Sequence, residues 1–182
     1  MKKHSWLLWL TALLPYLVLA ALAMIFLSSD VPFFGDMMAS VFHNNALYLI
    51  GALLICFAVA TVLSVVHGVL AVRRQWDALS LVRTALVIKL FQIPAYLLIF
   101  AVGVLSLITI FTIPFTIGLF LLDVFMLVLS GIIVLAASIN AIRQGQMPLQ
   151  KTILFVLMQF VFCADVFAAF AFYRALKKAV VL

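Results

Sequence analysis

Charged residues are scarce in this chain of 182 residues: 9% are Asp, Glu, Lys or Arg, whereas 69% are hydrophobic. Soluble globular domains average roughly 25% charged residues and about 45–50% apolar ones. A chain of this composition has too few polar side chains to cover the apolar surface of a water-soluble fold. The composition therefore predicts an integral membrane protein, with the lipid bilayer as its first partner.

Sequence motifs for catalysis or metal binding do not occur in the chain: it has no HExxH, GxSxG, P-loop, GxGxxG or CxxC. Asp30, Asp36 and His43 stand near one another, but their spacing matches no metal-ligand motif. The only two cysteines, Cys56 and Cys163, both fall in apolar runs, which is typical of small buried hydrophobes rather than a disulfide framework. We therefore expect no cofactor, no metal site and no enzymatic activity.

The net charge of +6 comes from short basic clusters beside apolar runs. This arrangement is typical of membrane topology signals, and there is no basic stripe with interleaved aromatics of the kind that binds nucleic acid. Nucleic acid is therefore not an expected partner.

Apolar runs long enough to cross a bilayer, which takes about 20 residues, define the spans. The first run continues to Leu27, longer than the roughly 7–15 residues of a signal-peptide core, and so favours a retained helix. The run from Thr84 to Leu122 holds 39 residues, nearly twice one crossing, and Pro114 suits the start of a new helix. Pro94 is expected to kink its helix without ending it. The predicted spans are 6–27, 46–72, 84–110, 115–142 and 152–173.

The distribution of Lys and Arg predicts the orientation, because cytoplasmic loops carry an excess of both. The 28–45 loop has none, so the N-terminus is expected in the cytoplasm and, with five crossings, the C-terminus outside. That arrangement places the basic tail on the outer side. In the alternative, the last span is re-entrant and the tail joins the other basic residues. The residues concerned are Lys2, Lys3, Arg73, Arg74, Arg83, Arg143 and Lys151 on the inner side, and Arg174, Lys177 and Lys178 in the tail.

Two aspartates interrupt apolar segments: Asp123 in "FLLDVFMLVL" and Asp165 in "FCADVFAAF". An isolated carboxylate in hydrocarbon costs about 2.5–3.5 kcal/mol on insertion scales, so we expect both to point into the bundle. One hypothesis is that each serves as a hydrogen-bonded contact between helices. The other is that the two face a shared pocket and bind a proton or a cation.

Other polar residues in the spans have simpler interpretations. Lys89 lies about 9 Å along the helix from Arg83, so its side chain is expected to extend to the interface. His67 is expected to be a hydrogen-bonded packing residue. Ala60, Ser64 and Gly68 form a face of small residues that lets another helix approach closely, either within the bundle or from a partner membrane protein. A second small face runs through Ser130, Ala137 and Ala141.

Taken together, these patterns predict an all-α membrane protein: a bundle of about five transmembrane helices forming one domain over residues 1–182, in a cell membrane of the cytoplasmic type. The first functional hypothesis is a non-enzymatic accessory protein or subunit of a larger membrane complex. The alternative is a small transporter or permease component that uses Asp123 and Asp165 as a proton or cation site.

Overall fold

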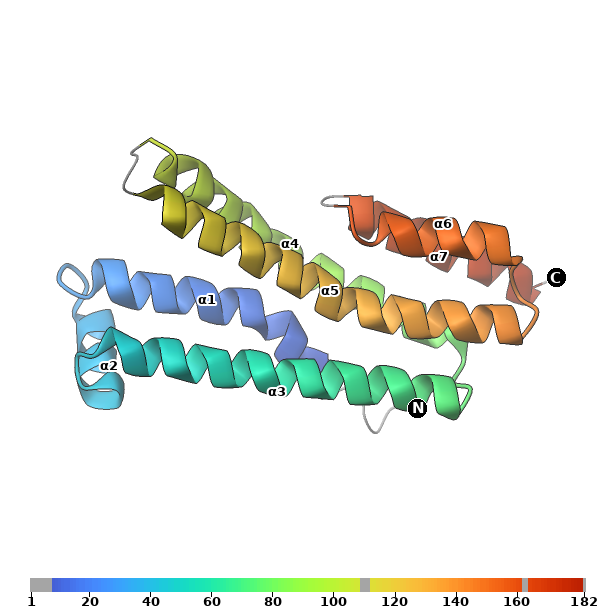
Figure 1. Cartoon of the computed structure of the whole chain (residues 1–182), viewed down its shortest axis with the longest axis horizontal. Coiled ribbons are helices and arrows are strands. Elements are labelled where there is room, and N and C mark those ends of the chain that lie inside the picture. Colours follow the sequence, from blue (N-terminus) through green and yellow to red (C-terminus); the bar gives the residue numbers. More distant parts are fainter. Residues whose placement is uncertain (1–7, 109–111, 162–163, 182) are drawn as a thin grey trace.

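The computed structural model describes residues 8–108, 112–161 and 164–181, and every regular element in that part of the chain is helical. The prediction of an all-α bundle is confirmed (Figure 1). Lys2, Lys3 and Cys163 lie outside the described residues. The helices are α1 (Trp9–Leu27), α2 (Pro32–Phe42), α3 (Ala46–Arg73), α4 (Ala78–Ser106), α5 (Ile113–Arg143), α6 (Leu149–Met158) and α7 (Ala164–Val181).

Four helices among the described residues are long and apolar enough to cross a membrane: α1, α3, α4 and α5. They run along the long axis of the molecule (Figure 1). The longest three have 28, 29 and 31 residues, or about 42–46 Å at 1.5 Å per residue, which exceeds a hydrocarbon core of about 30 Å. The chain is therefore a multi-pass membrane protein whose helix ends reach the interfacial regions.

The predicted division of the long apolar run near Pro114 is confirmed. Helix α4 ends at Ser106, and α5 begins at Ile113 with Pro114 in its first turn. Pro94 stays inside α4. The start of α4 lies earlier than predicted, at Ala78, because the Asp77 carboxylate accepts a hydrogen bond from the Ser80 N–H at 2.9 Å and caps the helix.

Helix α2 lies across the ends of α1 and α3 (Figure 1). The helix begins at Pro32, whose fixed φ suits a first turn. It ends at Phe42, and the C-cap residue His43 adopts the left-handed conformation with φ 53°. The Asn45 side chain then caps α3 by accepting the Leu47 N–H at 2.9 Å.

The predicted fifth span, 152–173, is not one helix. Helix α6 ends at Met158, a turn follows at 159–161, and α7 runs back beside α6. The rings of Phe155 in α6 and Phe172 in α7 stack with centroids 5.2 Å apart, and the C-terminus returns to the end of the bundle where α6 begins (Figure 1). This corrects the number of complete crossings, since a hairpin takes the place of the last one. It also keeps the basic residues of α7 out of the apolar part of the bundle.

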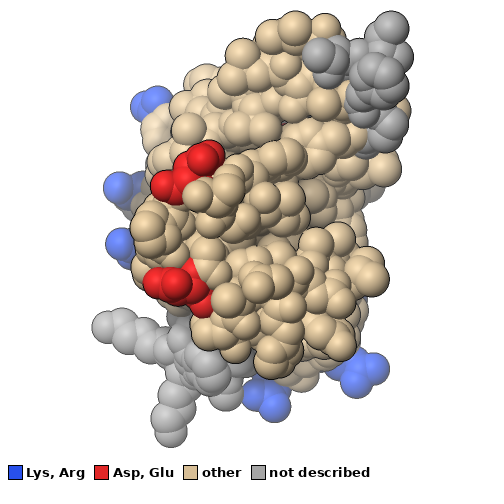
Figure 2. All heavy atoms as spheres, turned by 90° about the vertical axis from the view of Figure 1, so that its left-hand side faces the viewer, with Lys and Arg blue, Asp and Glu red and all other residues tan. Residues whose placement is uncertain are grey.

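Charge is divided between the two ends of the bundle. We call the end where α3 and α5 terminate the basic end, and the opposite end the α2 end. The connection through α2 carries Asp30 and Asp36, and the face of the α2 end shows Lys and Arg only at its margins (Figure 2). Of the described basic residues, Lys89 alone lies deep in the bundle. The others belong to the basic end: Arg73, Arg74, Arg83, Arg143, Lys151, Arg174, Lys177 and Lys178.

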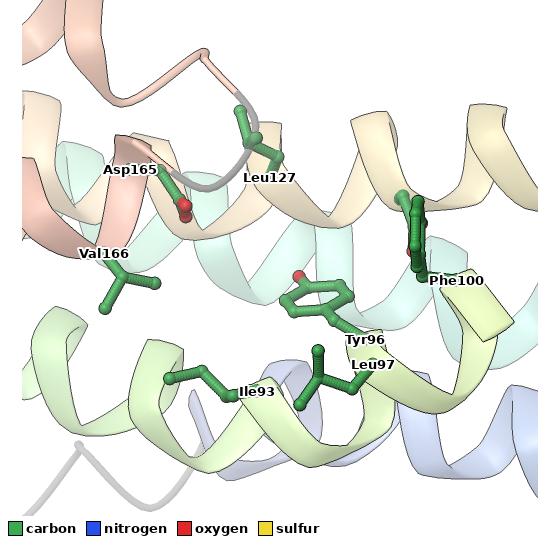
Figure 3. Close-up of a pocket in the computed structure, with 8 residues that line it drawn as sticks. Ile93, Tyr96, Leu97, Phe100, Leu127, Asp165 and Val166 are labelled. Carbon is green, nitrogen blue, oxygen red and sulfur yellow. The ribbon is translucent and has the colours of Figure 1, made fainter.

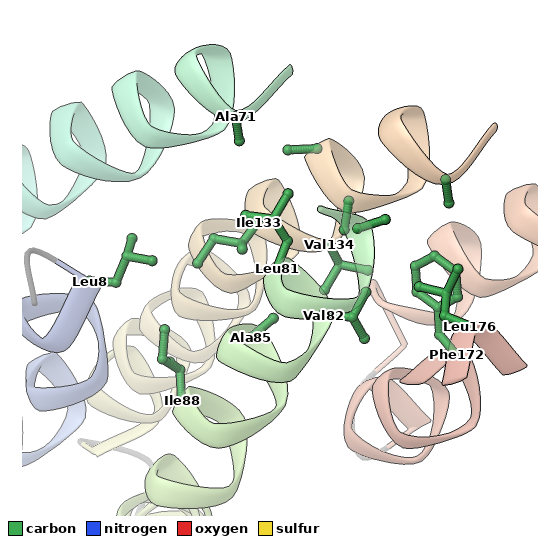
Figure 4. Close-up of a cluster of buried hydrophobic side chains, with 14 of the residues drawn as sticks. Leu8, Ala71, Leu81, Val82, Ala85, Ile88, Ile133, Val134, Phe172 and Leu176 are labelled. Atoms are coloured by element: carbon green, nitrogen blue, oxygen red, sulfur yellow. The ribbon is translucent and has the colours of Figure 1, made fainter. Parts of the chain in front are cut away.

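A cluster of buried apolar side chains fixes α7 against the rest of the bundle (Figure 4). Phe172 and Leu176 of α7 are fully buried in it, next to residues near the start of α4 and in the second half of α5. The C-terminal half of α7 is thus held in the basic half of the bundle, which leaves its first turn at mid-depth. Labelled members from other helices are Leu8, Ala71, Leu81, Val82, Ala85, Ile88, Ile133 and Val134.

The small-residue face of α3 is used inside the bundle. Ala60, Ser64 and Gly68 are all buried. The Ser64 hydroxyl lies 3.2 Å from that of Thr11 on α1, and a Cβ added at Gly68 would lie 2.8 Å from Cγ2 of Ile132 on α5. These residues therefore allow α1 and α5 to approach α3 closely. Ser130, Ala137 and Ala141 of the second face are buried as well.

Candidate cation-binding site between α4, α5 and α7

A buried ion pair joins three helices at mid-depth. Lys89 Nζ on α4 donates hydrogen bonds to Asp165 Oδ2 on α7 at 2.5 Å and to Ser130 Oγ on α5 at 3.0 Å. Only 1% of Lys89 is exposed. The prediction that Lys89 extends to the membrane interface is therefore wrong. Two oxygens inside the bundle bind the ammonium group and replace the water that the interface would have supplied.

One turn further along α4, a second polar contact ties α4 to α1. Gln92 is fully buried, and its Nε2 donates to the Thr11 carbonyl oxygen at 2.8 Å. The Tyr96 hydroxyl in turn donates to Gln92 Oε1 at 3.3 Å. These bonds fix the Tyr96 ring beside the space between α4, α5 and α7.

His67 belongs to a different part of the bundle. It is buried on α3 near the basic end, and its ring meets that of Trp76 edge to face, with centroids 4.9 Å apart. This aromatic contact gives His67 a packing role, as the sequence led us to expect.

A cavity of about 390 Å³ lies between α4, α5 and α7, and both aspartates line it. Asp123 comes from α5 and Asp165 from the first turn of α7, and each is 8% exposed. Both are therefore buried in the bundle, as predicted. The Tyr96 side chain points into the same space (Figure 3). The remaining lining residues are apolar: Ile93, Leu97, Phe100, Leu127 and Val166.

Asp123 differs from Asp165 in having no partner for a buried carboxylate oxygen. Its Oδ1 makes no hydrogen bond to any of the described residues. The hypothesis of a hydrogen-bonded contact between helices therefore finds no partner for this oxygen in the described part of the structure. A buried carboxylate in this state carries an unrecovered desolvation cost of several kcal/mol. A proton or a cation at Asp123 would remove that cost.

The cavity opens toward the side of the bundle. Leu97 and Phe100 at its rim are 64% and 57% exposed and lie on the apolar outer surface of α4. The α6–α7 hairpin covers the basic half of α4 and α5 and leaves their other half uncovered (Figure 1). In a bilayer, the rim therefore faces the hydrocarbon interior rather than either aqueous phase.

Comparison of the chain with protein-family models, with curated proteins and with solved structures found no match. The two aspartates were found from the sequence because each interrupts an apolar run. Lys89 and Ser130 were not assigned to the site, although an isolated lysine inside a span with few other charges was a usable signal.

Proposed function

We propose that the chain is a small, non-enzymatic membrane transporter or permease component in which Asp123 binds a proton or a cation. The observation that supports this most directly is a buried Asp123 oxygen that lies beside a cavity and has no hydrogen-bond partner among the described residues. Ionisable residues inside membranes mark ion and proton pathways far more often than exposed ones do. A purely structural carboxylate at this position would be expected to have a partner, as Asp165 has.

The two aspartates take different parts in this proposal. Asp165 is neutralised by Lys89 and holds the first turn of α7 against α4 and α5. Asp123 is the exchanging group, because within the described part of the chain only Asp165 of the two is paired with a cation. Binding a proton or cation there changes the net charge of a buried site.

The test measures the flux of protons or cations into proteoliposomes under an imposed proton gradient. Asp123→Asn keeps the size and hydrogen-bonding ability of the side chain but removes the charge, and we expect it to fold and to abolish flux. Asp30→Asn makes the same chemical change in the exposed connection before α2 and should leave flux unchanged. Full flux in the Asp123→Asn protein would contradict the proposal.

An accessory role in a larger complex, the first hypothesis from the sequence, stays a prediction. The face of Ala60, Ser64 and Gly68 that was a candidate for a partner is occupied by α1 and α5. A partner would therefore contact another part of the surface. Stoichiometric co-purification of a second membrane protein, together with absence of flux from the isolated chain, would favour this role over transport.

We also propose that the protein resides in the cell membrane with its basic end and N-terminus in the cytoplasm. The segregation of the described basic residues to one end supports this orientation under the positive-inside rule. The test uses single cysteines at Ser29 and Gln75 in a protein whose Cys56 and Cys163 are replaced by alanine. An impermeant thiol reagent should label position 29 from outside. Labelling of position 75 alone would reverse the orientation.

A further inference from the structure

We propose, on the basis of the transporter function above, that the ligand of the Asp123 cavity is an organic ammonium ion with an apolar body, and that it enters from the membrane interior. The proposal combines three observations: a carboxylate with a buried oxygen that no described residue binds, apolar walls, and a rim on the lipid-facing surface.

The charges around the cavity select a single positive group. Asp165 already binds Lys89 at 2.5 Å, so the pair contributes no net charge. Asp123 then gives the cavity a net charge of −1 when it is ionised. One ammonium group at Asp123 neutralises the site, whereas an anionic ligand would place a second negative charge beside a buried carboxylate.

The walls of the cavity disfavour a bare metal ion. Ca²⁺ takes 6–8 oxygen ligands, and Mg²⁺ requires a near-octahedral set. The described lining residues offer two carboxylates and one phenol, of which one carboxylate is engaged by Lys89 and the phenol by Gln92. Hydrocarbon forms the rest of the lining, and it is complementary to an apolar body rather than to a hydrated ion.

The Tyr96 ring adds a second recognition element. A cation over an aromatic face gains about 0.5–2 kcal/mol, depending on how far it is desolvated, and this mode is common for ammonium ligands. Tyr96 points into the cavity from α4 and is held there through its hydroxyl by Gln92 (Figure 3). Asp123 and Tyr96 line the same cavity, so an ammonium group bound there has both a carboxylate and an aromatic ring in its walls.

The size and position of the cavity indicate the rest of the ligand. The cavity volume of about 390 Å³ falls within the range of about 300–1,000 Å³ that small-molecule sites occupy. It is far larger than the space that a bound proton takes up. Leu97 and Phe100 at the rim are exposed on the outer surface of α4. A molecule that partitions into the bilayer through an apolar body therefore reaches the rim without crossing the aqueous phase.

The experiment measures binding of radiolabelled 4-phenylbutyltrimethylammonium to the protein in nanodiscs, with its uncharged isostere, in which carbon replaces nitrogen, as the matched probe. We expect the cation to bind and the isostere to bind at least tenfold more weakly. Asp123→Asn should weaken binding of the cation by about tenfold to a hundredfold, or about 1.4–2.8 kcal/mol, because the carboxylate charge that attracts the cation is lost. Asp30→Asn should have no effect.

A second variant addresses the case in which Asp123→Asn fails to fold. Leu97→Trp keeps the carboxylate but adds bulk at the rim, and we expect it to weaken or slow binding of the cation. Equal binding of both probes would overturn the proposal, as would unchanged binding of the cation in the Asp123→Asn and Leu97→Trp proteins.

The outcome also separates this proposal from the transporter function. Proton flux that depends on Asp123, without binding of the ammonium probe, would overturn the ligand class and leave the transporter standing. Binding of the probe that depends on Asp123, without any flux, would support the ligand class and contradict transport.

Discussion

Asp123 and Asp165 share the local sequence Asp-Val-Phe, are equally buried and line the same cavity, yet their environments differ. Asp165 has a cation at 2.5 Å, whereas Asp123 has a buried oxygen with no partner in the described residues. Local sequence therefore does not decide the role of an acid within a membrane. The partner that another helix provides decides it, and here α4 provides one for Asp165 only.

The two environments predict opposite responses to substitution. A buried ion pair adds little net stability, but removing one partner leaves the other charge uncompensated, at a cost of about 3–5 kcal/mol. A buried acid without a partner already carries such a cost, so replacing it with an apolar residue should raise the free energy of unfolding. Stability measurements on matched variants can therefore show whether one acid is structural and the other functional.

The largest effect is expected from Lys89→Met, which leaves Asp165 buried without its cation. We expect a loss of about 3–5 kcal/mol in the free energy of unfolding, measured by thermal or denaturant unfolding in detergent micelles. The double variant Lys89→Met, Asp165→Leu removes both charges and should recover most of that stability. A single variant as stable as the parent would show that the pair does not hold α7 in place.

An intermediate effect of opposite sign is expected from Asp123→Leu. Removing an unpartnered carboxylate from the bundle should raise the free energy of unfolding by about 1–3 kcal/mol, because the insertion cost of the charge disappears. Flux should be lost at the same time, as is common where a functional site reduces stability. If this variant is less stable than the parent, Asp123 has a structural partner and the contrast with Asp165 fails.

The smallest effect is expected from Gly68→Ala. This variant shows how much a change in helix packing alone, without a change in charge, alters the free energy of unfolding. The added methyl group would lie 2.8 Å from Ile132 Cγ2, so the side chain must shift at a cost of about 1 kcal/mol or more. Gly51→Ala in the same helix has nothing within 4 Å and is the control. Equal stability of the two variants would show that α3 and α5 are less closely packed than described.

Helix lengths and breaks could be predicted where apolarity and proline determine them. Spans α1, α3 and α5 match apolar runs to within a few residues at their described ends, and Pro114 marks the start of α5. The α6–α7 hairpin corresponds to the re-entrant alternative and not to the predicted fifth span. Residues 152–173 contain neither proline nor glycine, so composition alone cannot distinguish one crossing from two shorter helices. The basic tail on the wrong side of the five-span arrangement was the available signal.

The candidate site could be predicted only in part. Each aspartate was identified from its own surroundings, but the cavity depends on how α4, α5 and α7 pack. Lys89 and Asp165 are separated by 76 positions, and no periodicity along the chain connects them. Pairing of this kind follows from tertiary structure, which also explains why the partnerless state of Asp123 became visible only in the folded chain.

The return of α7 to the basic end also bears on how the protein is made. Both connections at the α2 end, residues 28–45 and 107–112, contain no lysine or arginine. If the basic end faces the ribosome, only short segments with two aspartates must be moved across the bilayer during insertion. The cationic part of α7 then never crosses, so the α6–α7 hairpin can insert from one side and be held in place by the contact between Asp165 and Lys89.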